Sequence, residues 1–152
     1  MIIIFSLFLG NEALSATSKS SVGLIKLKSQ NSVKLTLDRM QSQLEKKGMT
    51  IFARVNHGKG ARSVGQKLRE TQLLIFGNPK IGTKLMNCNQ SAGIDLPQKA
   101  LAWKDEKGDV WLAYNNPIYF AKRHKIEKCA KNVLIKISKA LAKFAAFASG
   151  SL

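Results

Sequence analysis

The sequence has few acidic residues. Nine Asp and Glu stand against twenty-five Lys and Arg, so the chain of 152 residues has a formal net charge of +16. This imbalance favours anionic partners such as nucleic acid, acidic lipid head groups or other polyanions. Lys is far commoner than Arg, which suits solubilisation better than bidentate recognition of phosphates or bases. The charge therefore predicts an anionic partner. No nucleic-acid-binding motif is present, so the sequence predicts no specific nucleic-acid function.

Several chemical signatures are also missing. Cys88 and Cys129 are the only cysteines, and the absence of a CxxC pair or a close Cys/His cluster excludes a zinc site of the usual spacing. The GxxxxGKS/T spacing of a P-loop is absent, and no Ser-His-Asp or Cys-His arrangement can be assembled. The sequence therefore favours a protein that is not an enzyme. The two cysteines can form a disulfide or lie apart as buried apolar residues, and their spacing leaves both open.

The N-terminus carries an apolar run, Ile2 to Leu9, about half as long as a bilayer-spanning helix. Small residues follow and end at Ala16, which is typical of a secretory signal peptide. We expect residues 1–16 to be a signal peptide and 17–152 a single domain, periplasmic or secreted, and not transmembrane after signal removal. No basic residue precedes Ile2, which a start codon further upstream would explain. The alternative is a first β-strand.

Hydrophobic periodicity predicts alternating strands and helices in the rest of the chain. We expect strands near residues 22–28, 49–55, 72–76, 99–104 and 110–114, the last two joined by a hairpin turn at Asp105–Gly108. We expect helices near residues 33–47, 61–68, 81–90 and 117–124, a turn at 56–60 and a loop at 91–97. Hairpin and crossover connections are mixed. The sequence thus predicts an α+β domain, with a mixed sheet of about five strands and packed helices.

The last segment, Ile126 to Ala148, has apolar residues on one broad face at helical spacing and lysines on the other. This pattern predicts a long amphipathic helix. Such a helix can lie on an anionic membrane surface. Its apolar face equally suits docking onto the domain, which is the arrangement we expect.

Several longer segments resemble one family of proteins. They are Met49–Gly58, Leu68–Met86, Ala92–Trp103, Tyr114–Pro117 and Lys122–His124. Together they are similar to the bacterial family called domain of unknown function 302, over about residues 21–148. The resemblance implies a compact α+β fold that can form dimers, and export with a signal peptide, but it implies no activity. The residue after Thr83 is often proline in these relatives and is Lys84 here.

The matching segments contain the candidate ligand-binding residues. His57 and His124 are the only histidines, and imidazole binds transition metals or haem iron well. The two can share a metal or ligand site, or lie apart and make structural hydrogen bonds. Arg54, Arg69 and Arg123 can complete an anion pocket, because a guanidinium binds two oxygens at once. The alternative, which we favour, is a set of ion pairs with the carboxylates of Asp38, Glu70 and Asp95.

The segment Gly77–Thr83 joins a strand to a helix and contains Asn78 and Lys80. Strand-to-helix loops often bind ligands, and a helix N-terminus favours an anion. We therefore take this loop as the best local candidate for a binding site, with a simple turn shaped by Asn78 and Pro79 as the alternative. Trp103 and Trp111 flank the hairpin turn and suit a core or an interface.

These patterns predict a non-catalytic binding module of the cell envelope, for a small anionic ligand, a metal or a protein partner. One alternative is a structural protein that acts through a dimer surface, and another is a protein whose basic face binds an anionic membrane surface. A pocket lined by His57, His124 and the Asn78 loop would favour the first hypothesis. A flat apolar patch around the hairpin strands would favour the second. No particular cofactor is indicated.

Overall fold

A computed structural model describes residues 23–151, so the predicted signal peptide lies outside the described residues. Five strands form one sheet in the order β1-β5-β4-β3-β2. Their bounds are β1 (Leu24–Ser29), β2 (Thr50–Asn56), β3 (Thr71–Gly77), β4 (Gln98–Lys104) and β5 (Val110–Asn115). The expected α+β class, the five strands and the hairpin between β4 and β5 are confirmed, and Gly108 has the positive φ of 84° that this turn requires.

The expected mixture of parallel and antiparallel pairing is wrong, because every neighbouring pair of strands is antiparallel. The reason lies in the one long crossover. Helix α1 (Val33–Lys46) carries the chain from β1 at one edge of the sheet to β2 at the other. These two strands run in the same direction but never pair.

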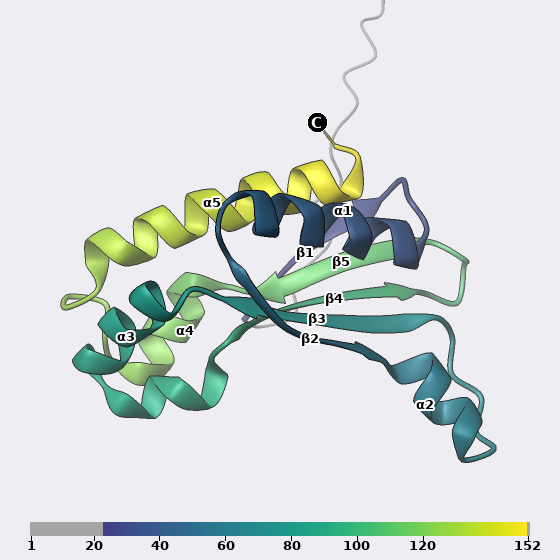
Figure 1. Ribbon diagram of the computed structural model, residues 1–152, viewed down its shortest axis with the longest axis horizontal. Coiled ribbons are helices and arrows are strands. Elements are labelled where there is room, and N and C mark those ends of the chain that lie inside the picture. Colours follow the sequence, from purple (N-terminus) through teal and green to yellow (C-terminus); the bar gives the residue numbers. More distant parts are fainter. Residues whose placement is uncertain (1–22, 152) are drawn as a thin grey trace, which may run out of the picture.

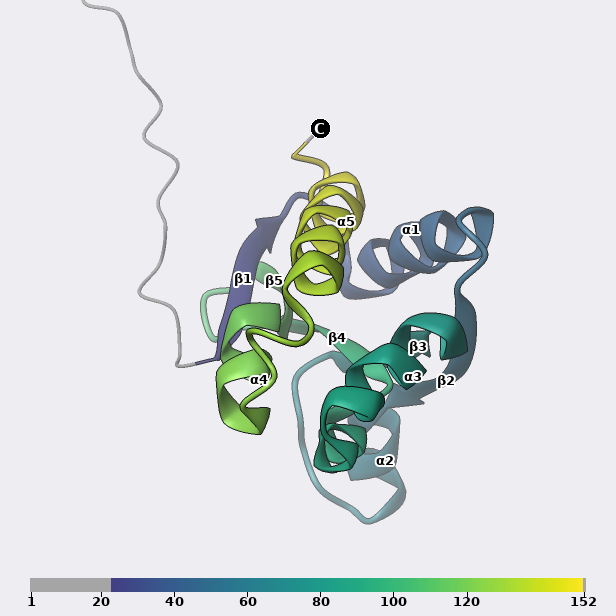
Figure 2. The same ribbon diagram turned by 90° about the vertical axis from the view of Figure 1, so that its left-hand side faces the viewer.

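Helices α1 and α5 (Lys131–Ser149) lie side by side on one face of the sheet (Figures 1 and 2). The expected C-terminal amphipathic helix is thus confirmed, and its apolar face is docked on the domain. Arg39 of α1 donates two hydrogen bonds, of 3.1 and 2.8 Å, to the Phe147 carbonyl of α5. The main hydrophobic cluster fills the space beneath both helices, with fully buried Val33, Leu37, Met40, Leu44, Leu74, Phe76, Ala100, Ala102, Leu112, Ala145 and Ala148.

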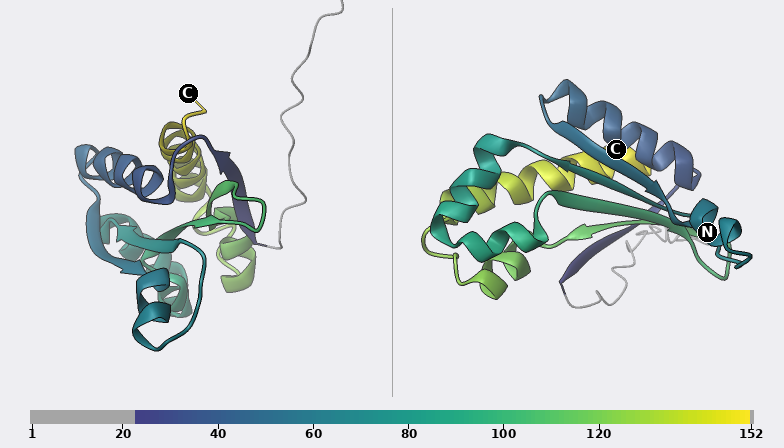
Figure 3. Two further views of the ribbon diagram at one scale, coloured as in Figure 1. Left: turned by 90° about the vertical axis from the view of Figure 1, so that its right-hand side faces the viewer. Right: turned by 60° about the horizontal axis from the view of Figure 1, so that its bottom comes forward.

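No helix among residues 23–151 runs across the opposite face of the sheet (Figure 3, right). Trp103 and Trp111 are directly paired across β4 and β5 and are half-buried. The Lys26 ammonium lies 3.9 Å from the Trp111 ring centroid and 5.2 Å from that of Trp103, close enough for a cation–π interaction.

A smaller hydrophobic cluster gathers α3 (Pro79–Cys88), the 3-10 helix η1 (Gln90–Asp95), α4 (Pro117–His124) and the start of α5. These elements lie at one end of the sheet, whereas α2 (His57–Ser63) lies at the other (Figure 1). The structure joins Cys88 and Cys129 in a disulfide with a Cα–Cα distance of 5.9 Å. The cluster consists of buried Leu85, Ala92, Phe120, Ala121, Ile126, Ala130 and Leu134.

The boundaries of α2, α3 and α5 differ from the sequence-based expectation. Helix α2 ends at Ser63 and not near residue 68, and α3 spans Pro79–Cys88 where 81–90 was expected. Helix α2 begins at His57 because the Asn56 side chain accepts a hydrogen bond of 2.8 Å from the Lys59 amide, which caps the helix where a turn was expected. Helix α5 begins only at Lys131, because Lys125 adopts a positive φ of 55° and residues 127–130 form turns. The helical spacing of apolar residues continues through these turns because Ile126 and Ala130 are buried in the smaller cluster. Within the expected loop at 91–97, residues 91–95 belong to η1.

Candidate functional site

The structure does not bring the two histidines together. His57 is exposed at the start of α2, and His124 is buried at the end of α4, at the opposite end of the sheet (Figure 1). Between residues 23 and 151, no group of three or more His, Cys, Asp and Glu side chains is arranged to hold a metal ion. The geometry therefore gives no support to a shared histidine site.

His124 is held instead by side chains of η1. Its Nε2 lies 2.6 Å from Asp95 Oδ2, and its Nδ1 lies 3.1 Å from Ser91 Oγ. In the tautomer that carries its hydrogen on Nε2, the ring donates a hydrogen bond to Asp95 and Nδ1 accepts one from the Ser91 hydroxyl. Arg123 adds a 3.2 Å contact to Asp95, and the Asn89 side-chain amide donates to the His124 carbonyl at 2.9 Å. We call these five residues the His124 cluster.

The His124 cluster aligns a serine, a histidine and an aspartate, the residue types of a nucleophile, its base and an orienting carboxylate. The Ser91 amide, however, already donates to Asn89 Oδ1 at 3.0 Å and cannot also stabilise an oxyanion. Ser91 lines neither of the two described cavities. These contacts join η1 to α4. Sequence reasoning missed it because no local spacing connects residues 33 positions apart.

The arginines also lie apart, and each pairs with a carboxylate. Arg54 of β2 contacts Asp38 of α1 and donates to Gln72 of β3. Arg69 is 3.5 Å from Glu106 in an exposed pair. Burial raises the pKa of Asp38, but hydrogen bonds from Lys34 and Arg54 outweigh it and hold that pKa below its ordinary value. The ion-pair alternative describes these arginines better than an anion pocket does.

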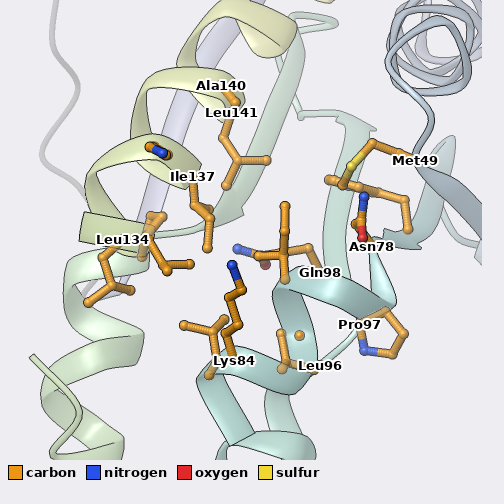
Figure 4. Close-up of a pocket in the computed structure, with 18 of the residues that line it drawn as sticks. Met49, Asn78, Lys84, Leu96, Pro97, Gln98, Leu134, Ile137, Ala140 and Leu141 are labelled. Carbon is orange, nitrogen blue, oxygen red and sulfur yellow. The ribbon is translucent and has the colours of Figure 1, made fainter. Parts of the chain in front are cut away.

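A cavity lies in a groove between α3 and α5, which we call the α3–α5 groove (Figure 4). Its volume is about 1050 Å³. Leu134, Ile137 and Leu141 of α5 form one wall, and α3 with the segment 96–98 forms the other. The ends of α1 and β3 close the remaining side. Other apolar residues also line the groove: Met49, Phe52, Phe76, Gly77, Pro97, Met86, Phe120, Val133, Ala140 and Phe144.

The segment predicted as a binding loop contributes to this groove, but only Asn78 lies between strand and helix, because residues 79–83 already belong to α3. Asn78, Pro79 and residues 81–83 line it, whereas exposed Lys80 does not. Asn78 also caps α3, because its side-chain oxygen accepts a 3.0 Å hydrogen bond from the Lys80 amide. The opposite wall was not foreseen, since an apolar helix face does not reveal which element it will meet.

The polar side chains of the groove are cationic or neutral. Lys47, Lys84, Lys136, Lys139 and Lys143 line it and are exposed, and we call them the lysine rim. Asn78, Thr83, Gln98 and Asn132 supply neutral polar groups. None of the described residues that line the groove is an Asp or a Glu. The groove therefore combines an apolar interior with a border of one charge sign.

Comparison with known proteins shows which family has this sequence and fold. Residues 25–144 match the family described as Domain of unknown function DUF302. The chain belongs to the DUF302 family. The fold of this DUF302 protein is shared by an uncharacterized conserved protein DUF302 from Bacillus stearothermophilus, whose crystal structure aligns with a TM-score of 0.74 and 16% sequence identity, over 84% of this chain and 99% of that one.

Curated relatives of this DUF302 chain are similar over 104 residues, with 45% identity. They are the fluoride-specific ion channels FluC 1 of Brucella suis biovar 1 (strain 1330) and FluC 1 of Brucella abortus biovar 1 (strain 9-941). The matched part is 68% of this chain but only 41% and 38% of the two channels, so the chain spans less than half of their length. Among residues 23–151, no helix has both the length and the apolar character needed to cross a membrane.

Proposed function

We propose that this DUF302 protein is a non-catalytic binding module and that the α3–α5 groove is its ligand site. The observation that carries the proposal is a cavity of about 1050 Å³ with a mainly apolar lining. Sites for small molecules are typically hollows of about 300–1000 Å³, lined by apolar side chains with a few polar groups. A ligand that fills the groove would remove this apolar surface from water, which is favourable.

The composition of the lining supports binding rather than chemistry. The only hydroxyl side chain among the lining residues is Thr83, and the Ser91–His124–Asp95 alignment lies outside the groove. A nucleophile or general acid usually works with a second titratable group beside it, and apart from the lysines the described lining residues include no Asp, Glu, His or Cys. The lining therefore offers apolar contact and positive charge, which are means of holding a molecule.

A neutral dye tests whether the groove binds apolar molecules. We expect Nile red to bind with increased fluorescence, and Ala140→Trp to weaken binding at least about tenfold, equivalent to about 1.4 kcal/mol, because the indole would occupy the groove. Ile135→Trp places the same side chain on the same helix, at a residue that is 43% exposed and outside the lining. This control should bind as the wild type does. Equal binding by all three proteins would refute the proposal.

We further propose that the protein is exported. The apolar run Ile2–Leu9 followed by Ala16 supports this, and so does the Cys88–Cys129 disulfide, because disulfides persist mainly in oxidising compartments. Expression of the full chain in a Gram-negative host, followed by periplasmic fractionation and intact mass measurement, tests the proposal. A periplasmic protein that begins at Thr17 is expected. A cytoplasmic protein with an intact N-terminus would contradict it.

Dimer formation stays a prediction, which sedimentation velocity would test.

A second candidate function is fluoride binding in association with fluoride transport. The 45% identity to fluoride-specific ion channels of Brucella supports it, and the net charge of +16 would attract fluoride as it attracts other anions. Fluorine NMR of fluoride, titrated with the protein in excess chloride, tests this role. Line broadening that chloride does not remove would favour it, and an unchanged signal would argue against direct fluoride binding.

A further inference from the structure

The α3–α5 groove has two chemically different parts. Its interior is formed by aliphatic and aromatic side chains, such as Leu134, Ile137 and Leu141. Its border is the lysine rim. Figure 4 shows the Lys84 side chain rising from α3 into the space between the walls, towards the side where Ile137 lies. An elongated apolar group can therefore occupy the interior while a polar end stays within reach of ammonium groups.

The lysine rim lacks partners within the described chain. Between residues 23 and 151, none of its five ammonium groups makes a hydrogen bond or an ion pair. Within the described chain Lys28 pairs with Asp109 and Lys34 with Asp38, whereas other exposed lysines such as Lys59 and Lys80 are unpaired like the rim, so it is the position of the rim around the hollow that sets it apart. Like charges around one hollow repel each other, and an anion placed among them relieves that repulsion. The rim is thus complementary to negative charge.

We propose that the ligand of the groove is a free single-chain amphipathic anion, such as a fatty carboxylate. Its chain lies between α3 and α5, and its carboxylate lies at the lysine rim beside Lys84. This inference rests on the proposed binding function and adds the chemical class of the ligand. Lysine suits this role because its ammonium is a compact charge on a flexible stem, which can follow a head group at the mouth of a groove.

A membrane surface fits the same lysines less well. The lysine rim borders a hollow between two helices, and three of its members lie on α5, whose apolar face points into the groove and the core. A flat bilayer would meet the ammonium groups but leave the hollow unfilled. A single chain that has left the bilayer satisfies both parts of the site.

Displacement of Nile red from the full domain tests the ligand class. Dodecanoate, dodecanol and dodecyltrimethylammonium each have a chain of twelve carbons, counting the carboxylate carbon, and differ in head-group charge. We expect dodecanoate to displace the dye at about fivefold lower concentration than dodecanol, the upper range for one exposed ion pair, and the cationic amphiphile to be weakest. High salt should reduce this preference. Shortening the chain by two methylenes, to decanoate, should weaken binding about fifteenfold, since each buried methylene contributes about fourfold.

Charge-removal variants locate the head group. Lys84→Gln with Lys139→Gln should abolish the preference for dodecanoate over dodecanol and leave the affinity for dodecanol unchanged. Lys59→Gln with Lys104→Gln removes the same charge at exposed positions outside the groove, and should keep the preference. A preference lost equally in both double variants would show an effect of net charge alone and would overturn the proposal.

The outcomes separate this inference from the function on which it rests. If Nile red does not bind, the groove is not a binding site and both fail. If the dye binds but dodecanol and dodecanoate compete equally, the groove stands and the anionic head group is wrong. If dodecanoate fails to compete while the protein floats with phosphatidylglycerol vesicles, the lysine rim serves a membrane surface and the proposal of a free amphiphile is overturned.

Discussion

The main hydrophobic cluster lies between the sheet and the helices α1 and α5, whereas the smaller cluster lies at the end of the sheet among α3, η1, α4 and the start of α5. The main cluster is built from apolar side chains, many with no exposed surface, and buried polar contacts such as that of Ser29 with Thr36 lie at its margin. The smaller cluster has half as many buried residues and is supplemented by the Cys88–Cys129 disulfide and the His124 cluster.

This difference follows from how hydrophobic stabilisation scales. The free energy gained is roughly proportional to the apolar area removed from water, so a small cluster gains less and relies more on covalent and polar ties. Helix α3 belongs to the smaller cluster and also forms one wall of the α3–α5 groove. The candidate site is thus placed beside the part of the molecule whose stability depends most on specific contacts, as is common for ligand-binding regions.

The largest effect should come from the main cluster. Leu37→Ala removes a side chain with 0% exposure from α1 and should lower the free energy of unfolding by about 2–5 kcal/mol, because the cavity cannot fully collapse. Urea denaturation measures the change. Leu35→Ala on the same helix, where the side chain is 46% exposed, should cost less than about 0.5 kcal/mol. Similar losses in both variants would show that α1 is not packed as described.

Removal of the disulfide should have the next largest effect. Cys88→Ala with Cys129→Ala opens a covalent loop with a sequence separation of 41 and should cost about 2–4 kcal/mol, chiefly through the unfolded chain. Hydrogen exchange sharpens the comparison of the two clusters. Amides of α3 and α4 should lose more protection than those of α1. Uniform loss across all helices would mean that the smaller cluster does not open separately.

A smaller loss is expected when the His124 cluster is broken. Asp95→Asn removes the carboxylate that faces the buried His124 ring at 2.6 Å and should cost about 1–3 kcal/mol in urea denaturation, because a buried nitrogen loses its charged partner. Asp109→Asn breaks an exposed pair with Lys28 and should cost less than about 1 kcal/mol. If the two variants were equally stable, the smaller cluster would not depend on its polar tie.

The smallest effect on the free energy of unfolding should come from the ion pairs of Asp38, which belongs to neither cluster, and this effect should depend on pH. The pKa of Asp38 is lowered from its ordinary value of 3.8 in the folded state. Its stabilisation is therefore present above pH 3.8 and disappears as the pH falls through the lower, folded-state pKa. Asp38→Asn should cost less than about 1 kcal/mol at neutral pH, and its difference from the wild type should vanish in acid. A pH-independent difference would contradict this assignment.

Local signals in the sequence predicted most of the fold. The helical spacing of Val33, Leu37, Met40 and Leu44 identified α1, and all four side chains are fully buried. The hairpin of β4 and β5 followed from its turn residues. The start of α2 was misplaced because the cap formed by Asn56 competes with a turn at the same residues. The start of α5 was misplaced because buried turns can imitate helical spacing.

The candidate site was predictable only in part. The loop at Asn78 was identified from its position between a strand and a helix, and it lines the groove. The pairing of His124 with Asp95 and Ser91 was not visible, and neither was the distance between His57 and His124. Such contacts depend on how distant elements dock, which residue type and local spacing do not encode.

The sequence by itself determined the strong positive charge, the amphipathic helices and the alternating strands, because composition and periodicity act over a few residues. The tertiary structure alone decided that all strands pair antiparallel, that Cys88 meets Cys129, and that α3 and α5 face each other across an apolar hollow. Those features arise when apolar faces from distant segments bury one another, and many pairings satisfy the same local pattern until packing selects one.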